Sequence, residues 1–166
     1  MEKPDIIGKV MSTVSGQDGK FLLNRVQTGL NMVCFAKEAE LYPDTRFAVS
    51  TDDITLNPLI RVKRDETTTD VSIRLGRKGV RLIGKIIDQK TGLTAKNTDL
   101  LLYLADEAGK STETTADLAG GFEFVVAPKR LRLRVSAFGY KEWTSPVILA
   151  SPGETKELSV TLQPTP

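Results

Sequence analysis

The side chains that could carry catalysis are few and scattered along this chain. Its 166 residues include no histidine and a single cysteine, Cys34. Histidine is the usual general base of hydrolases and the commonest zinc ligand, so both kinds of site lose their main component. No serine has the Gly-x-Ser-x-Gly spacing that places a nucleophile on a sharp turn. We therefore predict no catalytic residue and no cofactor, and we do not expect an enzyme.

Carboxylates occur as adjacent pairs at Asp52-Asp53, Asp65-Glu66 and Asp106-Glu107, with Asp44 near the first pair. Their oxygens are the hard ligands that calcium prefers, but no loop alternates Asp and Asn as a dedicated calcium site does. Acidic side chains are also common in solvated turns, where they bond their own backbone. We therefore predict no metal site and interpret the pairs as turn residues.

Basic residues gather at Lys129-Arg130, Arg132 and Arg134. They could contact phosphates, but no aromatic residue alternates with them, as stacking on single-stranded nucleic acid requires. Basic residues on an outward strand face also keep a sheet soluble and discourage edge pairing. The net charge of +2 gives no general attraction to polyanions. We predict no nucleic-acid partner.

Three aromatic residues, Trp143, Tyr42 and Tyr103, are candidates for contact with a glycan. Sugar rings stack on exposed aromatic faces, and Trp143 is the only tryptophan in the chain. Aromatic side chains also dominate protein cores, so a packing role for Trp143 is the competing interpretation.

The elements that would position these residues have the pattern of β-strands. Residues 131–137 alternate apolar and polar side chains with the period of two that marks a half-buried strand. Glycine- and proline-containing turns separate such segments, which is typical of a sandwich or barrel. The other alternating segments are 71–75, 122–124 and 158–162.

The two halves of the chain also align with each other. Residues 19–23 match 120–124, and residues 30–36 match 131–137 in the same register, at an offset of 101 residues. Self-similarity of this kind indicates a repeated structural unit. We therefore predict two tandem antiparallel β-sandwich repeats.

The first repeat differs from the second in length. Residues 68–75 match 155–162 at an offset of only 87 residues, so the first half carries 14 additional residues between positions 37 and 67. Only 18 residues precede Gly19, too few for the strands expected before the equivalent Gly120. The first repeat is therefore predicted to be incomplete and to contain an inserted loop.

Three segments of the second half together resemble a known family. They are Gly-Lys-Ile-Ile-Asp-Gln-Lys-Thr-Gly at 84–92, Thr-Ala-Asp at 115–117 followed by Gly-Gly-Phe-Glu-Phe at 120–124, and Val-Ser-Ala-Phe-Gly-Tyr at 135–140. The set resembles the carboxypeptidase regulatory-like domain, a transthyretin-like, or prealbumin-like, sandwich of seven strands. Collagen-adhesin B-type repeats and starch-binding-like domains are similar modules. The resemblance covers about residues 79–163, and more weakly 8–76.

The resemblance implies a module that carries no catalysis itself. The Asp-Gly that usually precedes the Phe in this family is Gly120-Gly121 in the second half, whereas the first half retains Asp18-Gly19. Glycine at this position suits a backbone that reverses with positive φ.

The repeat alignment predicts which side chains of the first half point inward. The predicted inward residues are Phe21, Leu23, Leu30, Met32, Cys34 and Ala36. The outward residues Leu22, Val33 and Phe35 are apolar, which is unusual for a solvent-facing strand. We expect the inserted segment, the neighbouring repeat or a partner to cover them, so these three residues are candidate partner contacts.

These observations lead to an incomplete sandwich at residues 1–78 and a complete one at 79–166. The predicted function is a structural or spacer module of a bacterial secreted, periplasmic or cell-surface protein, a location that rests on the resemblance. One alternative is a carbohydrate-binding module; another is an interaction domain that accepts a donated strand, including from a second copy. We expect no signal peptide and no membrane span, because the longest apolar run, residues 100–104, is too short.

Overall fold

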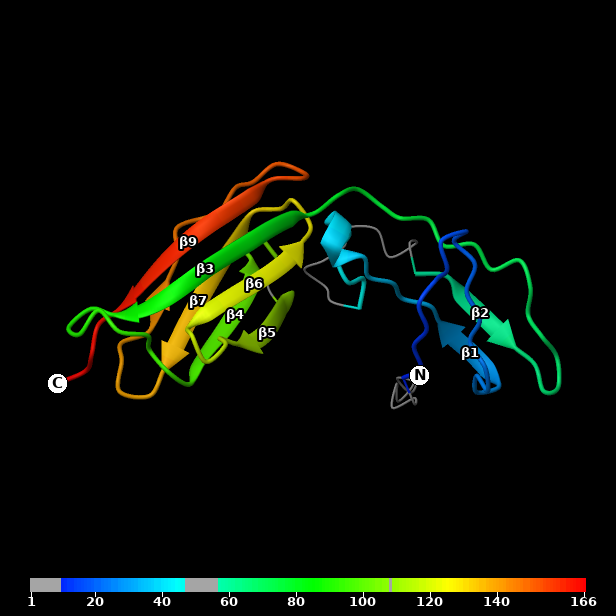
Figure 1. Ribbon diagram of the computed structural model, residues 1–166, viewed down its shortest axis with the longest axis horizontal. Helices are drawn as coiled ribbons and strands as arrows, with labels where there is room; N and C mark the ends of the chain where they lie inside the picture. The colour runs from blue at the N-terminus through cyan, green and yellow to red at the C-terminus, as the bar shows by residue number, and fades with distance from the viewer. Residues whose placement is uncertain (1–9, 47–56, 108) are drawn as a thin grey trace. The chain divides into compact units, whose positions relative to one another are not determined.

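The computed structural model describes residues 10–46, 57–107 and 109–166 (Figure 1). The chain divides into two compact units, the first made of Met1–Met32 and Leu59–Ser72, and the second of Val33–Pro58 and Ile73–Pro166. The described residues form strands and one short 3-10 helix, η1 (Glu38–Glu40). The predicted all-β class is confirmed, whereas the predicted domain limits stay a prediction.

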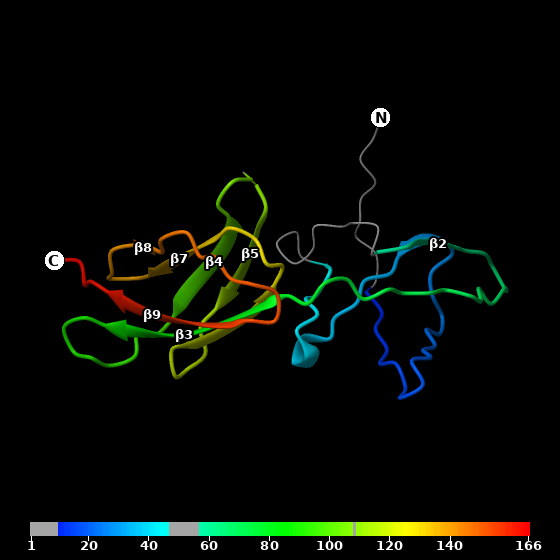
Figure 2. The same ribbon diagram turned by 90° about the horizontal axis from the view of Figure 1, so that it is seen from above.

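The second unit is a β-sandwich. Its described residues form two sheets, with strand orders β6-β3-β9 and β5-β4-β7-β8. Figure 2 shows β3 and β9 in one layer and β4, β5, β7 and β8 in the other. The strands are β3 (Val80–Asp88), β4 (Thr98–Leu104), β5 (Ser111–Thr115), β6 (Gly121–Val126), β7 (Leu131–Ala137), β8 (Trp143–Thr144) and β9 (Thr155–Leu162).

The core lies between the two sheets and follows from the alternation in the sequence. On β7, Leu131, Leu133 and Val135 are buried, while Arg134 and Ser136 are exposed on the other face. Successive strand side chains point to opposite faces, so a period of two places one apolar set against the facing sheet. The strand and the inward residues predicted from 131–137 are confirmed. The core includes Val80, Leu82 and Ile86 from β3, Leu100 and Leu102 from β4, and Val160 and Leu162 from β9.

A glycine in the middle of β3 makes room for an aromatic ring. Gly84 is paired with Phe122 across the β3–β6 ladder, and with Leu158 across the β3–β9 ladder. A Cβ atom at position 84 would lie 2.3 Å from the Phe122 ring and 2.4 Å from the Leu158 carbonyl oxygen. Glycine in a strand commonly marks such a close approach.

The turn before β6 uses a carboxylate and a positive φ. Asp117 Oδ1 accepts hydrogen bonds from the backbone N–H groups of Ala119 (2.8 Å) and Gly121 (2.7 Å). Gly120 has φ of +72°, a conformation that costs glycine little. The Gly-Gly in the position of the family's Asp-Gly therefore still provides the required reversal.

The first unit contains one antiparallel strand pair in its described part, formed by β1 (Gly29–Met32) and β2 (Leu59–Val62). The register runs from Gly29 opposite Val62 to Met32 opposite Leu59. Strands were also predicted at 21–23 and 71–75; both predictions are wrong, because no strand forms there. The incomplete sandwich expected in the first half, and with it the tandem repeat, stays a prediction.

The burial predicted for β1 is also wrong. Leu30 and Met32 were expected to point inward, but they are 60% and 55% exposed. Ala36 is exposed as well, and Cys34 is only half-buried. The physical reason is that alternation buries a face only when a second layer packs against it. The described part of the first unit supplies no second sheet.

Candidate functional site

Trp143 lies on the two-residue strand β8 at the edge of the four-stranded sheet. It is paired with the buried Val135 of β7 and packs partly against the core. Paired residues of antiparallel strands share a face, so the ring is directed toward the sandwich interior but is only half-buried. A hollow of about 270 Å³ adjoins the ring. The other residues lining it are Lys141, Glu142, Thr161 and Gln163.

The other two candidate aromatics do not join Trp143. Tyr103 lies on β4 opposite Ser111 and Arg132, on the outer face of the same sheet. Tyr42 lies far away in the sequence, in a segment that contacts the start of β3. Trp143 lines the hollow of about 270 Å³, and neither Tyr42 nor Tyr103 lines it, so the role of the three aromatics in binding a glycan stays a prediction.

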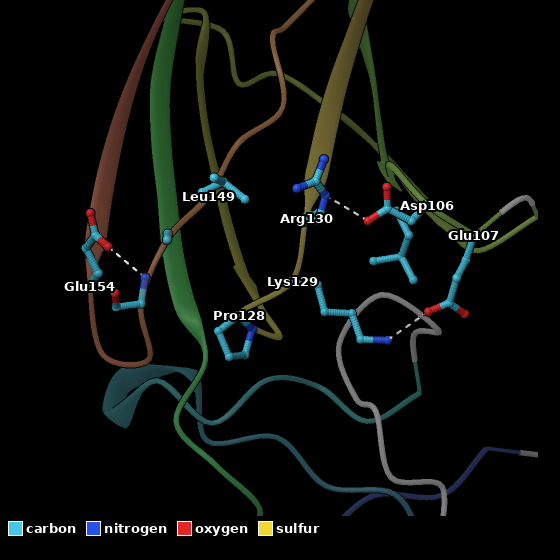
Figure 3. A pocket seen from close by; sticks show the side chains of 10 residues that line it. Asp106, Glu107, Pro128, Lys129, Arg130, Leu149 and Glu154 are labelled. Atoms are coloured by element: carbon cyan, nitrogen blue, oxygen red, sulfur yellow. Dashed lines mark hydrogen bonds and ion pairs between the residues drawn. The ribbon is translucent and has the colours of Figure 1, made fainter.

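A larger hollow of about 570 Å³ lies at the end of the sandwich where β3 begins (Figure 3). Three loops supply its charged groups. Arg130 Nε lies 2.8 Å from Asp106 Oδ2, and Lys129 Nζ lies 3.4 Å from Glu107 Oε1. Glu154 Oε2 accepts a hydrogen bond of 2.7 Å from the backbone N–H of Ser151.

These ion pairs give the larger hollow little net charge. Asp106 and Glu107 were interpreted as solvated turn residues, and Lys129 and Arg130 as part of a basic stripe. The structure brings the two pairs together, which the sequence does not indicate because they lie more than 20 residues apart. The Arg130–Asp106 pair is exposed on both sides, and such pairs contribute little stability.

A segment that precedes the sandwich in the chain docks on its first strand. We call residues 33–46 the docking segment. The Gly79 N–H donates a hydrogen bond of 2.6 Å to the Leu41 carbonyl, and the Arg81 guanidinium donates one of 3.3 Å to the Glu38 carbonyl. The Pro43 ring occupies the space that a Cβ at Gly79 would need, at 2.7 Å.

Two of the three candidate partner contacts belong to the docking segment. Val33 and Phe35 are half-buried, whereas Leu22, in the first unit, is 63% exposed. The Phe35 backbone is paired with Thr45: its N–H bonds Thr45 Oγ1 at 3.0 Å, and its carbonyl accepts the Thr45 N–H at 2.9 Å. Their role in binding a partner or a second copy stays a prediction.

The thiol of the docking segment lies in an unfavourable place for a nucleophile. Burial raises the pKa of the Cys34 thiol above its ordinary value, and the nearby Asp44 carboxylate adds to the effect. Asp44 is buried and is paired with Arg46, whose Nε lies 2.8 Å from Oδ2. A raised pKa lowers the thiolate fraction, so Cys34 has little reactivity at neutral pH.

Asp52 and Asp53, considered for calcium, lie outside the described residues. Within the described ranges, no cluster of three or more acidic or cysteine side chains could hold a metal ion. Those ranges also contain no helix long and apolar enough to span a bilayer.

Asp88 ties the turn after β3 to the loop after β7. Its Oδ2 accepts a hydrogen bond of 2.7 Å from the Tyr140 hydroxyl, and its Oδ1 accepts the backbone N–H groups of Lys90 and Thr91. The Tyr140 bond, followed by the backbone bonds, lowers the pKa of Asp88 below 3.8. The same contact raises the pKa of Tyr140 above 10.0.

Replacing Tyr140 with phenylalanine should raise the pKa of Asp88 toward its ordinary value, because the strongest donor to the carboxylate is lost. A lowered carboxyl pKa contributes stability that is present above 3.8 and lost as pH falls through the folded-state value. The stability difference between wild type and Y140F should therefore shrink below pH 3.8. Carboxyl NMR titration and urea unfolding at several pH values measure both effects.

The matched control is Tyr103→Phe. Tyr103 lies on β4, where it is opposite Ser111 of β5 and Arg132 of β7. This substitution should leave the Asp88 titration unchanged. An Asp88 pKa that is identical in wild type and Y140F would contradict the assigned hydrogen bond.

Comparison with known proteins identifies the sandwich. The sequence model of the carboxypeptidase regulatory-like domain matches residues 81–163, which is half of the chain. The chain belongs to this family. The match spans β3 to β9, so the resemblance seen in the second half is confirmed for the complete sandwich. No curated protein matches the chain with significance.

Solved structures similar to this regulatory-like chain come from varied proteins. A candidate carbohydrate-binding protein from Bacteroides uniformis has 12% identity and a TM-score of 0.42, covering 52% of this chain and 42% of its own. The 3-chlorocatechol 1,2-dioxygenase of Rhodococcus opacus has 16% identity and a TM-score of 0.42, covering 55% and 63%. The pilus 2b backbone protein of group B streptococcus has 15% identity and a TM-score of 0.41, covering 64% and 47%. The chain thus spans less than two thirds of each.

Proposed function

We propose that this chain is a non-catalytic structural spacer in a secreted, periplasmic or cell-surface protein. The observation that carries the proposal is the parallel pairing of the first and last strands of the regulatory-like domain. β3 and β9 pair from Arg81 opposite Thr155 to Asp88 opposite Leu162. Because the two strands run in the same direction, the chain enters the sandwich at one end and leaves it at the other.

Figure 1 shows this arrangement: β3 and β9 lie side by side, and the C-terminus continues beyond the tip of β9. Eight paired residues at about 3.3 Å each separate the two ends by roughly 25 Å. Domain termini often lie close together, which suits insertion into another domain. Termini at opposite ends suit a domain that stands in series with its neighbours and sets their separation.

The location in this proposal can be tested on intact producing cells. An antibody against the sandwich should label cells whose outer layers have been made permeable but whose cytoplasmic membrane is sealed. Protease added from outside should remove the signal while a cytoplasmic marker is retained. Labelling that requires lysis of the cytoplasmic membrane would contradict the proposed location.

Carbohydrate binding at the Trp143 hollow is a second candidate function. The observation that favours it is the combination of one half-exposed indole with an amide, a carboxylate, an ammonium and a hydroxyl around 270 Å³ of space. Apolar surface with a few polar groups to fix orientation is the usual composition of a small-ligand site.

A bound glycan should change the intrinsic fluorescence in a saturable way, since Trp143 is the only tryptophan. Gln163→Ala retains the fluorophore and removes one hydrogen-bonding group, which should weaken binding roughly fivefold. The control Gln17→Ala, in the first unit, should leave the affinity unchanged. Absence of any saturable response across a panel of oligosaccharides would exclude this candidate.

A further inference from the structure

The pairing of β3 with β9 is extended at both ends by further backbone hydrogen bonds. At the start, the Arg81 N–H bonds the Glu154 carbonyl at 2.9 Å, and the Gly153 N–H bonds the Gly79 carbonyl at 2.8 Å. At the other end, the Gln89 N–H bonds the Leu162 carbonyl at 2.9 Å. The ladder thus begins where the chain enters the sandwich and ends where it leaves.

Tension along the chain acts on this ladder in a defined direction. A pull from the N-terminal side draws β3 toward Val80, and a pull from the C-terminal side draws β9 toward Leu162. The two strands are therefore pulled in opposite directions along their common axis. Hydrogen bonds between strands run across that axis. When the strands slide past each other, all of these bonds are therefore loaded at the same time and do not break one after another.

The core opposes the same sliding movement. Leu82 and Ile86 on β3, and Val160 and Leu162 on β9, are completely buried. A relative shift of the strands would move these side chains out of their packed positions before any new contacts replace them. Close-packed interiors do not deform gradually, so the resistance is concentrated in a short displacement.

Tension reaches the other strands only after β3 and β9 have separated. β6 pairs with β3 on its opposite edge, and β4, β5, β7 and β8 belong to the other sheet. All five lie between β3 and β9 in the sequence, so they are outside the direct load path while the ladder holds.

We propose that the β3–β9 pair is a mechanical clamp that keeps the regulatory-like domain folded when the chain is under tension. This goes beyond the spacer role, because a spacer only separates its neighbours, whereas the clamp bears force between them. It follows from the topology of the sandwich and does not depend on where the protein is located.

The direction of loading provides the test, using the full chain with Cys34→Ser and two new cysteines as attachment points for optical tweezers. The first variant carries Lys78→Cys and Thr165→Cys, so force shears β3 against β9. The second carries Lys78→Cys and Pro152→Cys, which lie at the same end of the ladder, so force peels the strands apart. All three attachment positions are exposed.

At the same loading rate, we expect the shear variant to unfold at a force at least about twice that of the peeling variant, because forced unfolding is governed by the barrier along the pulling direction. Both variants should have the same urea midpoint, which shows that direction, not stability, causes the difference. Equal unfolding forces would overturn the clamp. A second set of cysteine sites repeats the comparison, with Arg77 and Gln163 for shear and Arg77 and Ser151 for peeling. Agreement between the two sets excludes a local effect of one cysteine.

The force measurement leaves the spacer proposal separately testable. Equal unfolding forces in the shear and peeling variants would refute the clamp, but they would not change the distance between the two ends of the sandwich. Conversely, a protein found only in the cytoplasm would refute the proposed location without changing the force ratio.

Discussion

Leu82→Ala should lower the free energy of unfolding of the sandwich by about 3 kcal/mol, within the usual 2–5 kcal/mol for such a change in a core. Leu82 is completely buried in the middle of the core. The change removes apolar contact and leaves a cavity between two sheets that cannot close fully. Domains of this size have total stabilities of about 5–15 kcal/mol, so the loss is a large fraction.

Urea unfolding followed by fluorescence measures this effect, because the single tryptophan lies in the sandwich unit. Leu118→Ala is the matched control: the substitution is chemically identical, but Leu118 is 97% exposed. That variant should stay within about 0.5 kcal/mol of wild type. Equal losses for the two variants would mean that Leu82 does not lie in a packed core.

Gly84→Ala should destabilise the sandwich by about 2 kcal/mol or more, although it adds only one methyl group. The new Cβ would lie 2.3 Å from Phe122 Cζ and 2.4 Å from Leu158 O. The ring can turn away at the cost of its packing, but the carbonyl belongs to the β3–β9 ladder. Relief of the clash therefore requires the two strands to move apart.

The control for this substitution is Lys85→Ala on the next residue of the same strand. Lys85 is exposed, so introducing alanine at this position should change the free energy of unfolding by no more than about 0.5 kcal/mol. Unfolding curves that coincide for Gly84→Ala and Lys85→Ala would contradict the close approach of β3, β6 and β9.

The fold of the second half could be predicted from sequence because local pattern and tertiary environment agree there. Residues 131–137 alternate, and a facing sheet exists to bury Leu131, Leu133 and Val135. In the first half, residues 30–36 align with this strand, but Val33 and Phe35 interrupt the alternation. The described part of that unit places no second layer against Leu30 and Met32. The repeat alignment predicts the same inward residues in both halves, but it does not show whether a facing sheet is present to bury them.

The candidate site could be predicted only in part. The sequence singles out Trp143 as a rare and large aromatic, but its hollow depends on bringing residues 141–143 beside Thr161 and Gln163 at the sandwich edge. The larger hollow likewise joins three separate loops, and neither Leu149 nor Glu154 was expected there. The sequence singles out Asp106-Glu107 and Lys129-Arg130 near this hollow, but nothing in the sequence indicates that the two groups meet.

The sequence marked Val33 and Phe35 of the docking segment as apolar residues that need a cover, but it did not indicate the contact with β3. That contact uses the carbonyl groups of Leu41 and Glu38, and every residue has a carbonyl group. Side-chain patterns cannot reveal contacts of this kind. The buried Gly79, which admits the Pro43 ring, is recognisable as a requirement only when the structure is known.

The distance between Lys78 and Gln163 tests the central claim most directly, because both residues are exposed and flank the β3–β9 ladder. Spin labels at these positions in a Cys34→Ser background should give one narrow distribution near 35 Å, from a strand rise of about 3.3 Å per residue. Such a value places the two chain ends at opposite ends of the sandwich. A main distance below about 20 Å, as antiparallel first and last strands would give, would contradict the spacer and the clamp together.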